Sequence, residues 1–169
     1  MKKTAPFEFE LRPASADDAD FLFRLYASTR TDELDAAAFP AEMREPFLRM
    51  QHAAQTTHYS RTYPEAVHRV IMDGEVRIGR ELVHRDADGI LLVDVAILPA
   101  YCGRGIGTSL LDSLMKECSS NGRPLRLHVF KMNENAYRRY IRLGFRVVSD
   151  DGMYLSMEWT SADAKQSAA

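Results

Sequence analysis

DVAILPAYCGRGIGTSLL, residues 94–111, joins an apolar run, a glycine-rich turn and the start of an apolar helical repeat. The pattern predicts a strand that leads through a turn into a helix. At such a junction the first backbone N–H groups of the helix have no intrahelical partner, and the helix dipole places its positive end there. Gly103, Gly105 and Gly107 lack Cβ atoms, so the backbone can approach a ligand and adopt positive φ. The stretch predicts a cradle for an anionic group such as a pyrophosphate.

The spacing of the glycines excludes two other phosphate-binding motifs. The dinucleotide fingerprint requires glycine at the place of Thr108, and the loop of the nucleotide hydrolases requires a Gly-Lys-Ser/Thr sequence that is absent. The stretch resembles the acetyl-CoA loop of the GNAT N-acetyltransferases, Arg/Gln-x-x-Gly-x-Gly/Ala after a strand. Cys102 stands where that family has Arg or Gln, and Arg104 could supply the charge. The family's other positions are matched by Pro99, Tyr101, Gly105, Ile106 and Gly107.

A second motif supports this resemblance. Asn133-Glu-Asn-Ala136, followed by Tyr140 and Leu143-Gly-Phe145, is similar to the family's Asn-x-x-Ala-x-x-x-Tyr-x-x-x-Gly-Phe pattern. The resemblance implies acetyl-CoA as cosubstrate, Tyr140 as proton donor to the departing thiolate, and Asn133 as a cofactor contact. The alternatives are a purely structural strand-to-helix turn, a core tyrosine and a capping asparagine. The implied cofactor-binding residues are Val95, Ala96, Ile97, Cys102, Gly103, Arg104, Gly105, Ile106, Gly107, Thr108, Asn133 and Tyr140.

Composition is that of one ordinary globular domain. The chain has 169 residues, 46% hydrophobic and 27% charged, with a formal net charge of −2, so nothing favours a nucleic acid partner. Cys102 and Cys118 are too few for a disulfide framework and lack metal-ligand spacing. The sequence lacks an apolar run of about twenty residues and an apolar signal core. We expect a cytoplasmic protein without a membrane or metal partner.

The order of elements gives the fold class. Period-two patterns and turn signals predict strands, and repeats at helical spacing predict helices. This order is that of the GNAT fold, an α/β (α+β) fold with a mixed, mostly antiparallel sheet of about seven strands flanked by about four helices. We expect a single domain over residues 1–160 and a disordered tail over 161–169. The expected strands are 7–11, 67–72, 76–84, 90–98, 125–130, 145–148 and 154–159, and the helices are 16–28, one starting near 40, 106–120 and 135–143.

Two residues are candidates for the general base that deprotonates an amine acceptor. His128 lies five residues before Asn133, where some family members carry a glutamate base, and an imidazole titrates near neutrality. It can equally be a half-buried strand residue. Asp94 is a lone carboxylate inside an apolar strand, which is costly unless it is paired or functional. Arg80 or Arg126 is a candidate partner, and deprotonation through water remains open.

The acceptor site is expected within residues 29–64, because in this fold the first two helices and their connection cover the mouth opposite the cofactor. The region carries Phe47, Met50, His52, His58, Tyr59 and Tyr63. We therefore predict transfer of an acetyl group to a small-molecule or peptide amine, and leave a homodimer open. The alternative is an acyl-CoA-binding module without turnover, which the departure at Cys102 favours.

Overall fold

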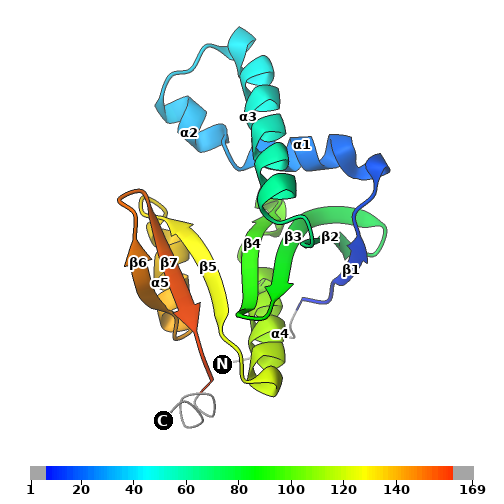
Figure 1. Cartoon of the computed structure of the whole chain (residues 1–169). Helices are drawn as coiled ribbons and strands as arrows, with labels where there is room; N and C mark the ends of the chain where they lie inside the picture. Colours follow the sequence, from blue (N-terminus) through cyan, green and yellow to red (C-terminus); the bar gives the residue numbers. More distant parts are fainter. Residues whose placement is uncertain (1–6, 162–169) are drawn as a thin grey trace, which may run out of the picture. The chain divides into compact units, whose positions relative to one another are not determined.

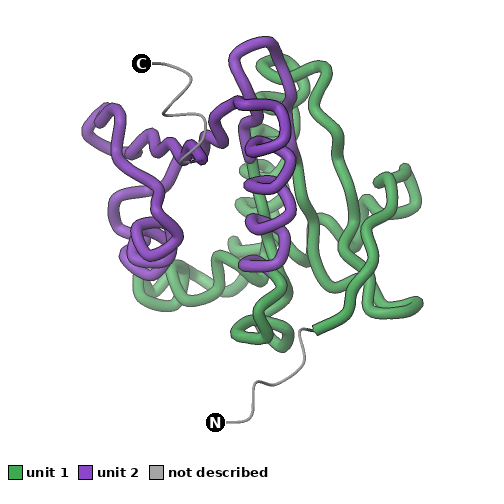
Figure 2. The backbone as a smooth tube through the Cα atoms, turned by 90° about the horizontal axis from the view of Figure 1, so that it is seen from below, with its two compact units in different colours: residues 1–82, 94–106 green, residues 83–93, 107–169 purple. Residues whose placement is uncertain are grey.

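The computed structural model describes residues 7–161. The chain divides into two compact units (Figure 2), the first of residues 1–82 and 94–106 and the second of residues 83–93 and 107–169. Strands β3 and β4 each contribute residues to both units. The predicted disordered tail, residues 161–169, lies outside the described residues except for Ser161.

The described strands form one mixed, mostly antiparallel sheet of seven, as the sequence predicted. Their order is β1-β2-β3-β4-β5-β7-β6. β4 and β5 pair in parallel, because α4 connects them, whereas the pairs β1–β2, β5–β7 and β6–β7 are antiparallel. The strands are β1 (Glu10–Pro13), β2 (Val67–Asp73), β3 (Val76–Asp86), β4 (Gly89–Ile97), β5 (Leu125–Phe130), β6 (Arg146–Asp150) and β7 (Tyr154–Trp159).

Residues 7–161 contain five α-helices, one more than the four that the sequence predicted. The additional helix, α2, has six residues and a single buried side chain, Leu34, so it produces no helical repeat in the sequence. It lies beside the N-terminal half of α3 (Figure 1), where the rings of Phe39 and Phe47 are 4.8 Å apart. The helices are α1 (Ala19–Ser28), α2 (Thr31–Ala36), α3 (Ala41–Thr62), α4 (Ile106–Asn121) and α5 (Glu134–Arg142).

The core of the first unit lies between α1 and one face of its strands. Val70 and Met72 alternate along β2 toward this face and pack with Phe21 and Leu25 of α1. Ala96 of β4 packs against the same cluster. The even-numbered residues of β2 and β4 therefore lie on one face of the sheet. His68 and Asp94 are on this face as well.

The N-terminal strand begins later than the sequence predicted. β1 starts at Glu10 instead of Phe7 and forms the edge of the sheet. Phe7 packs instead against the ring of Tyr101, with the ring centroids 6.0 Å apart. An alternating pattern cannot distinguish a paired residue from one whose side chain contacts a distant loop, so the strand boundary was wrong by three residues.

The second unit buries one face of α4 and one face of β5. The buried side chains are Leu110, Leu111, Leu114 and Cys118 of α4, and Leu125, Leu127 and Val129 of β5. His128 and Phe130 alternate with the buried residues of β5 and are exposed. Strand β6 is the other edge of the sheet and is exposed along its whole length.

Candidate functional site

The turn between β4 and α4 has the backbone that the glycine pattern predicted, at two of its three glycines. Gly103 (φ 79°) and Gly105 (φ 85°) are left-handed, and a Cβ built on either would meet nothing within 4 Å. Gly107 is not left-handed and is the second residue of α4. The turn is therefore exposed at the N-terminus of a sixteen-residue helix, where backbone N–H groups lack intrahelical partners.

Most side chains of this turn make contacts within the protein. Cys102 Sγ lies 3.7 Å from the carbonyl of Ile97 and 3.6 Å from that of Leu98. The guanidinium of Arg104 lies over the Tyr101 ring, 4.7 Å from its centroid. Ile106 is 1% exposed, so only its backbone can reach a ligand, whereas Thr108 is exposed. These contacts favour a cradle made by the backbone.

The predicted thioester-binding residues, Val95 to Ile97, lie at the end of β4 and are half-buried. Their strand is fixed by a close approach to β3, because a Cβ on Gly79 would lie 2.5 Å from the carbonyl oxygen of Ala96. Ile78 also accepts a hydrogen bond from the backbone N–H of Leu98 at 2.8 Å. The contact requires glycine at position 79 and keeps this part of β4 close to β3.

Asp94 is paired, as one alternative from the sequence had it. Its carboxylate accepts a hydrogen bond from Nη2 of Arg80, which is 6% exposed. The same nitrogen donates to Oε1 of Gln55 at 3.0 Å. The ion pair accounts for a carboxylate in an apolar strand without a role as base.

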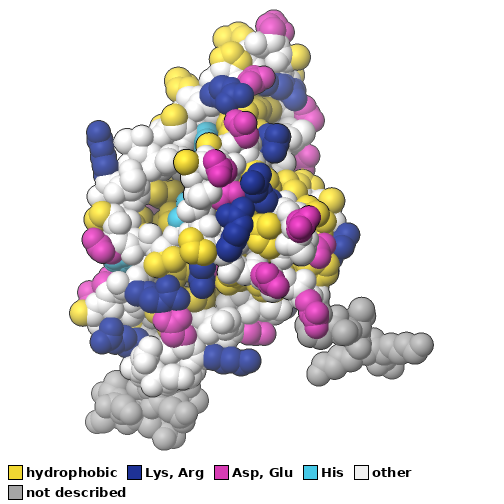
Figure 3. Space-filling view, turned by 90° about the vertical axis from the view of Figure 1, so that its right-hand side faces the viewer, with side chains coloured by type: hydrophobic (Ala, Val, Ile, Leu, Met, Phe, Trp, Pro, Cys, Tyr) yellow, Lys and Arg dark blue, Asp and Glu magenta, His cyan; other side chains and the backbone are white. Residues whose placement is uncertain are grey.

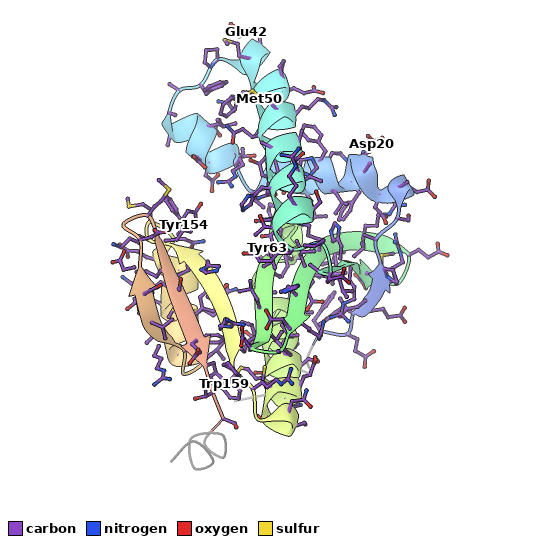
Figure 4. All side chains as sticks on the ribbon, viewed as in Figure 1. Asp20, Glu42, Met50, Tyr63, Tyr154 and Trp159 are labelled. Carbon is purple, nitrogen blue, oxygen red and sulfur yellow. The ribbon has the colours of Figure 1, made fainter. Side chains whose placement is uncertain are left out.

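A cavity of about 620 Å³ lies in the first unit, next to this ion pair. His52, Tyr59 and Tyr63 line it, so residues 29–64 supply part of its wall. That this region forms the acceptor site stays a prediction. Met50 is 59% exposed, and neither it nor Phe47 lines the cavity. Figure 4 labels Asp20 on α1 and Tyr63 after α3. The lining is Ser15, Ala19, Asp20, Leu22, Phe23, Arg49, His52, Thr56, Tyr59, Ser60, Tyr63, Pro64, Ala66, His68, Arg80 and Leu82.

Sequence reasoning missed His68, which lines the same cavity from β2. Burial and then the nearby charge of Arg80 lower the pKa of His68, and the same two causes lower the pKa of His52. Both imidazoles are therefore neutral at neutral pH. Nε2 of His68 is buried and has no hydrogen-bond partner among the described residues. The alternation of β2 places His68 on the face of Val70, which was the available signal.

The second family motif begins by capping helix α5. Asn133 precedes the helix, and its Oδ1 accepts a hydrogen bond from the backbone N–H of Ala136 at 3.1 Å. This is the contact that an asparagine N-cap makes, and it satisfies one N–H of the first turn. Asn133 thus has the structural role that the sequence left as an alternative, whereas its predicted cofactor contact stays a prediction.

The same motif also closes the helix at its other end. Gly144 is left-handed (φ 91°) and donates to the carbonyl of Ile141, while the N–H of Phe145 donates to the carbonyl of Tyr140, both at 3.0 Å. The rings of Tyr140 and Phe145 lie 5.6 Å apart. These are the two hydrogen bonds and the apolar contact of a Schellman motif. Tyr140 therefore occupies a fixed position near the end of a short helix.

His128 is exposed on β5, and its Nδ1 lies 3.0 Å from Oγ of Ser156 on the neighbouring strand. A hydrogen bond at one ring nitrogen fixes the ring orientation and leaves the other nitrogen for a second partner. His128 and Tyr140 belong to the second unit, whereas Asp94 belongs to the first. Whether the histidine or the carboxylate acts as the base stays a prediction.

Residues 7–161 contain no group of three or more histidine, cysteine, aspartate or glutamate residues that could hold a metal ion. Within the same residues, no helix is long and apolar enough to cross a membrane. On the face drawn in Figure 3, basic and acidic side chains are interspersed.

Comparisons with known proteins agree on one family. Residues 64–147 match the model of the acetyltransferase (GNAT) domain. The chain is similar to the solved structure of PaiA N-acetyltransferase from Thermoplasma acidophilum in complex with coenzyme A, with a TM-score of 0.70 and 21% identity over 92% of this chain and 100% of that one. No curated protein sequence matches the chain.

Two further solved structures have the same fold. An acetyltransferase from Thermus thermophilus gives a TM-score of 0.63 and 23% identity over 90% of this chain and 96% of that one. The ribosomal-protein-S18-alanine N-acetyltransferase from Escherichia coli gives a TM-score of 0.60 and 19% identity over 90% of this chain and 94% of that one. Likeness at these identities shows the fold alone.

Proposed function

Because the chain belongs to the GNAT family of acetyltransferases, we propose that it transfers the acetyl group of acetyl-CoA directly to a primary amine of a small molecule or peptide. The observation that carries the proposal is the glycine turn before α4. Gly103 and Gly105 are left-handed and open, at the N-terminus of a long helix. This geometry suits a pyrophosphate bound by backbone N–H groups. PaiA from Thermoplasma acidophilum, which shares the fold, was solved with coenzyme A.

Acetyl-CoA would supply an activated acetyl group, and the chain would supply orientation and proton transfer. Backbone groups of Val95 to Ile97 would hold the thioester end, on a strand that Gly79 keeps close to β3. An aliphatic ammonium has a pKa of about 10 and must lose a proton before it attacks. His128 or a water molecule would take this proton. Tyr140, fixed by the capping of α5, would protonate the departing thiolate.

The same fold without turnover is the second candidate, an acyl-CoA-binding module. Cys102 favours it, because the family has Arg or Gln at this position. Thermal shift with CoA and thiol release from acetyl-CoA separate the two functions. An enzyme releases thiol with at least one amine of a broad panel, and mass spectrometry detects the acetylated amine. Stabilisation by CoA without thiol release across the panel would favour the module.

The proton donor can be tested with a matched pair of tyrosines on α5. Tyr140→Phe should lower kcat by roughly a hundredfold or more with little change in CoA affinity, since the ring remains. Tyr137→Phe removes a hydroxyl from the same helix and should leave kcat near that of the wild type. Full kcat in Tyr140→Phe would contradict the assignment.

The base can be tested by the pH dependence of kcat/KM. If His128 is the base, kcat/KM falls on the acidic side as the base takes up a proton, and His128→Ala removes this acidic limb. A limb that survives in His128→Ala but is lost in Asp94→Asn would assign the base to the carboxylate. A limb that survives in both variants would come from the ionisation of the amine.

A further inference from the structure

We propose that the cavity of the first unit is the acceptor site and that it takes small amines that also carry a carboxylate, which Arg80 binds. The inference rests on the proposed acetyltransferase function and adds the class of acceptor. The inference begins from Arg80, a residue that is 6% exposed and yet lines a cavity of about 620 Å³. A cavity of this size suits a small molecule.

Arg80 keeps hydrogen-bond donors for a ligand. Among the described residues, its hydrogen bonds to Asp94 and Gln55 both leave from Nη2. A guanidinium has five N–H donors in a planar fork, so those on Nε and Nη1 remain. A carboxylate is the group whose geometry matches this fork, and a charge-assisted hydrogen bond in a low-dielectric cavity is a strong one.

Two imidazoles of the cavity, those of His52 and His68, also suit an anion. His52 and His68 are neutral at neutral pH, so each can donate a hydrogen bond, and Nε2 of His68 is a buried nitrogen still without a partner among residues 7–161. Arg49 and Asp20 also line the cavity, but both are exposed, and Arg49 pairs with Glu45 at 2.7 Å as Arg80 pairs with Asp94. Arg80 is thus the buried cation of the lining.

The position of Arg80 also fits the reaction. Its partner Asp94 immediately precedes Val95, the first of the residues proposed to hold the thioester. A carboxylate on Arg80 would therefore lie near the reacting end of β4, as an α-amino acid requires, since one carbon separates its amine from its carboxylate. Phe23 and Leu82 line the cavity as well and would contact an apolar side chain.

The decisive experiment compares apolar amino acids with their amides, which differ in the charge of one group. Phenylalanine and phenylalaninamide, and leucine and leucinamide, are tested in two ways: kcat/KM for thiol release, and binding measured by saturation-transfer NMR in the presence of CoA. We expect the wild type to prefer each acid by about ten- to a hundredfold, the range for losing a hydrogen bond to a charged group. Arg80→Gln should abolish this preference, and Arg80→Lys should restore part of it.

Arg69→Gln is the matched control. Arg69, like Arg80, pairs with a carboxylate, in this case the buried Glu81, but it does not line the cavity. The variant breaks a comparable ion pair and should keep the preference for acids. The comparison in the wild type requires no variant to fold, and equal or tighter binding of the amides there would overturn the proposal.

The binding arm keeps this inference separate from the proposed function. If no amine releases thiol while acids still bind more tightly than amides, the acetyltransferase function fails and the anion site stands. If amides and acids are acetylated with equal kcat/KM, the acetyltransferase function stands and the anion site is wrong. Loss of preference in Arg69→Gln as well as in Arg80→Gln would also overturn the role of Arg80.

Discussion

Asp18 and Arg80 are both buried charges of the first unit, but their hydrogen bonding differs. Asp18 is 0% exposed and accepts hydrogen bonds from Arg12 at 2.7 and 2.8 Å and from the backbone N–H of Ser15 at 2.8 Å, with Arg77 2.9 Å away. Arg80 forms its two bonds from one nitrogen and lines a cavity. Asp18 is fully used by the fold, whereas Arg80 has donors left over.

The difference separates a structural charge from a binding charge. Burying an ion is costly, and the cost is offset only when its hydrogen bonds are made. The hydrogen bonds of Asp18 are made within the fold, because β1 and the turn before α1 converge on its carboxylate. The donors that Arg80 leaves beside a cavity are expected to find a ligand.

The largest effect on stability should follow the loss of the Asp18 charge. Asp18→Asn leaves two arginines without their common carboxylate and should lower the free energy of unfolding by about 3–5 kcal/mol. Urea denaturation measures this. Asp17→Asn, at an exposed neighbour, should change stability by less than about 0.5 kcal/mol. Equal effects of the two substitutions would contradict a structural role for Asp18.

The same carboxylate should also make stability depend on pH. The hydrogen bond from Arg12 holds the pKa of Asp18 well below the ordinary aspartate range. Its contribution is therefore complete above the unfolded pKa of about 3.9. Below that pH the contribution falls, because the unfolded chain takes up the proton first. The stability difference between the wild type and Asp18→Asn should shrink by about 1.4 kcal/mol per pH unit there. A constant difference from pH 7 to pH 3 would argue against this ionised carboxylate.

Removing the charge of Asp94, the partner of Arg80, should have a smaller effect on stability and should strengthen ligand binding. Asp94→Asn removes the negative charge that pairs with Arg80 but keeps an oxygen that can accept its hydrogen bond. We therefore expect the free energy of unfolding, measured by urea denaturation, to fall by about 1–2 kcal/mol. The preference for amino acids over their amides should rise severalfold, since Arg80 then interacts with the ligand carboxylate alone. A preference that falls on this substitution would show that Asp94, too, contacts the acceptor.

Local sequence signals predicted most of the fold. The alternation in β5, the turn signals at the two ends of β3 and the glycine turn before α4 depend on neighbouring residues. The capping of α5 by Asn133 and Gly144 is local as well. Turns and caps are determined within a few residues, so sequence patterns can reveal them. The start of β1 was missed because Phe7 contacts the distant Tyr101. Helix α2 was missed because a helix of six residues with one buried side chain gives no helical repeat.

The candidate site was predictable only in part, for the same reason. Asp94 stood out in its strand, yet the sequence left its partner open between Arg80 and Arg126. The cavity brings together side chains of α1, α3, β2 and β3. No local pattern shows that His68 and Arg80 line one cavity with His52, since up to 28 residues separate them along the chain.

The most direct test of the central claim is the affinity for CoA of two alanine variants at the ends of α4, measured by titration calorimetry. Gly105 and Gly122 are both left-handed, and a Cβ on either meets nothing within 4 Å. Alanine should therefore strain both alike, by about 1–2 kcal/mol of stability. Gly105→Ala should weaken CoA binding by about tenfold or more, because it disturbs the backbone donors at the N-terminus. Gly122→Ala, at the C-terminus, should bind CoA like the wild type. Unchanged CoA affinity in Gly105→Ala would contradict the assignment of the glycine turn as the cofactor cradle.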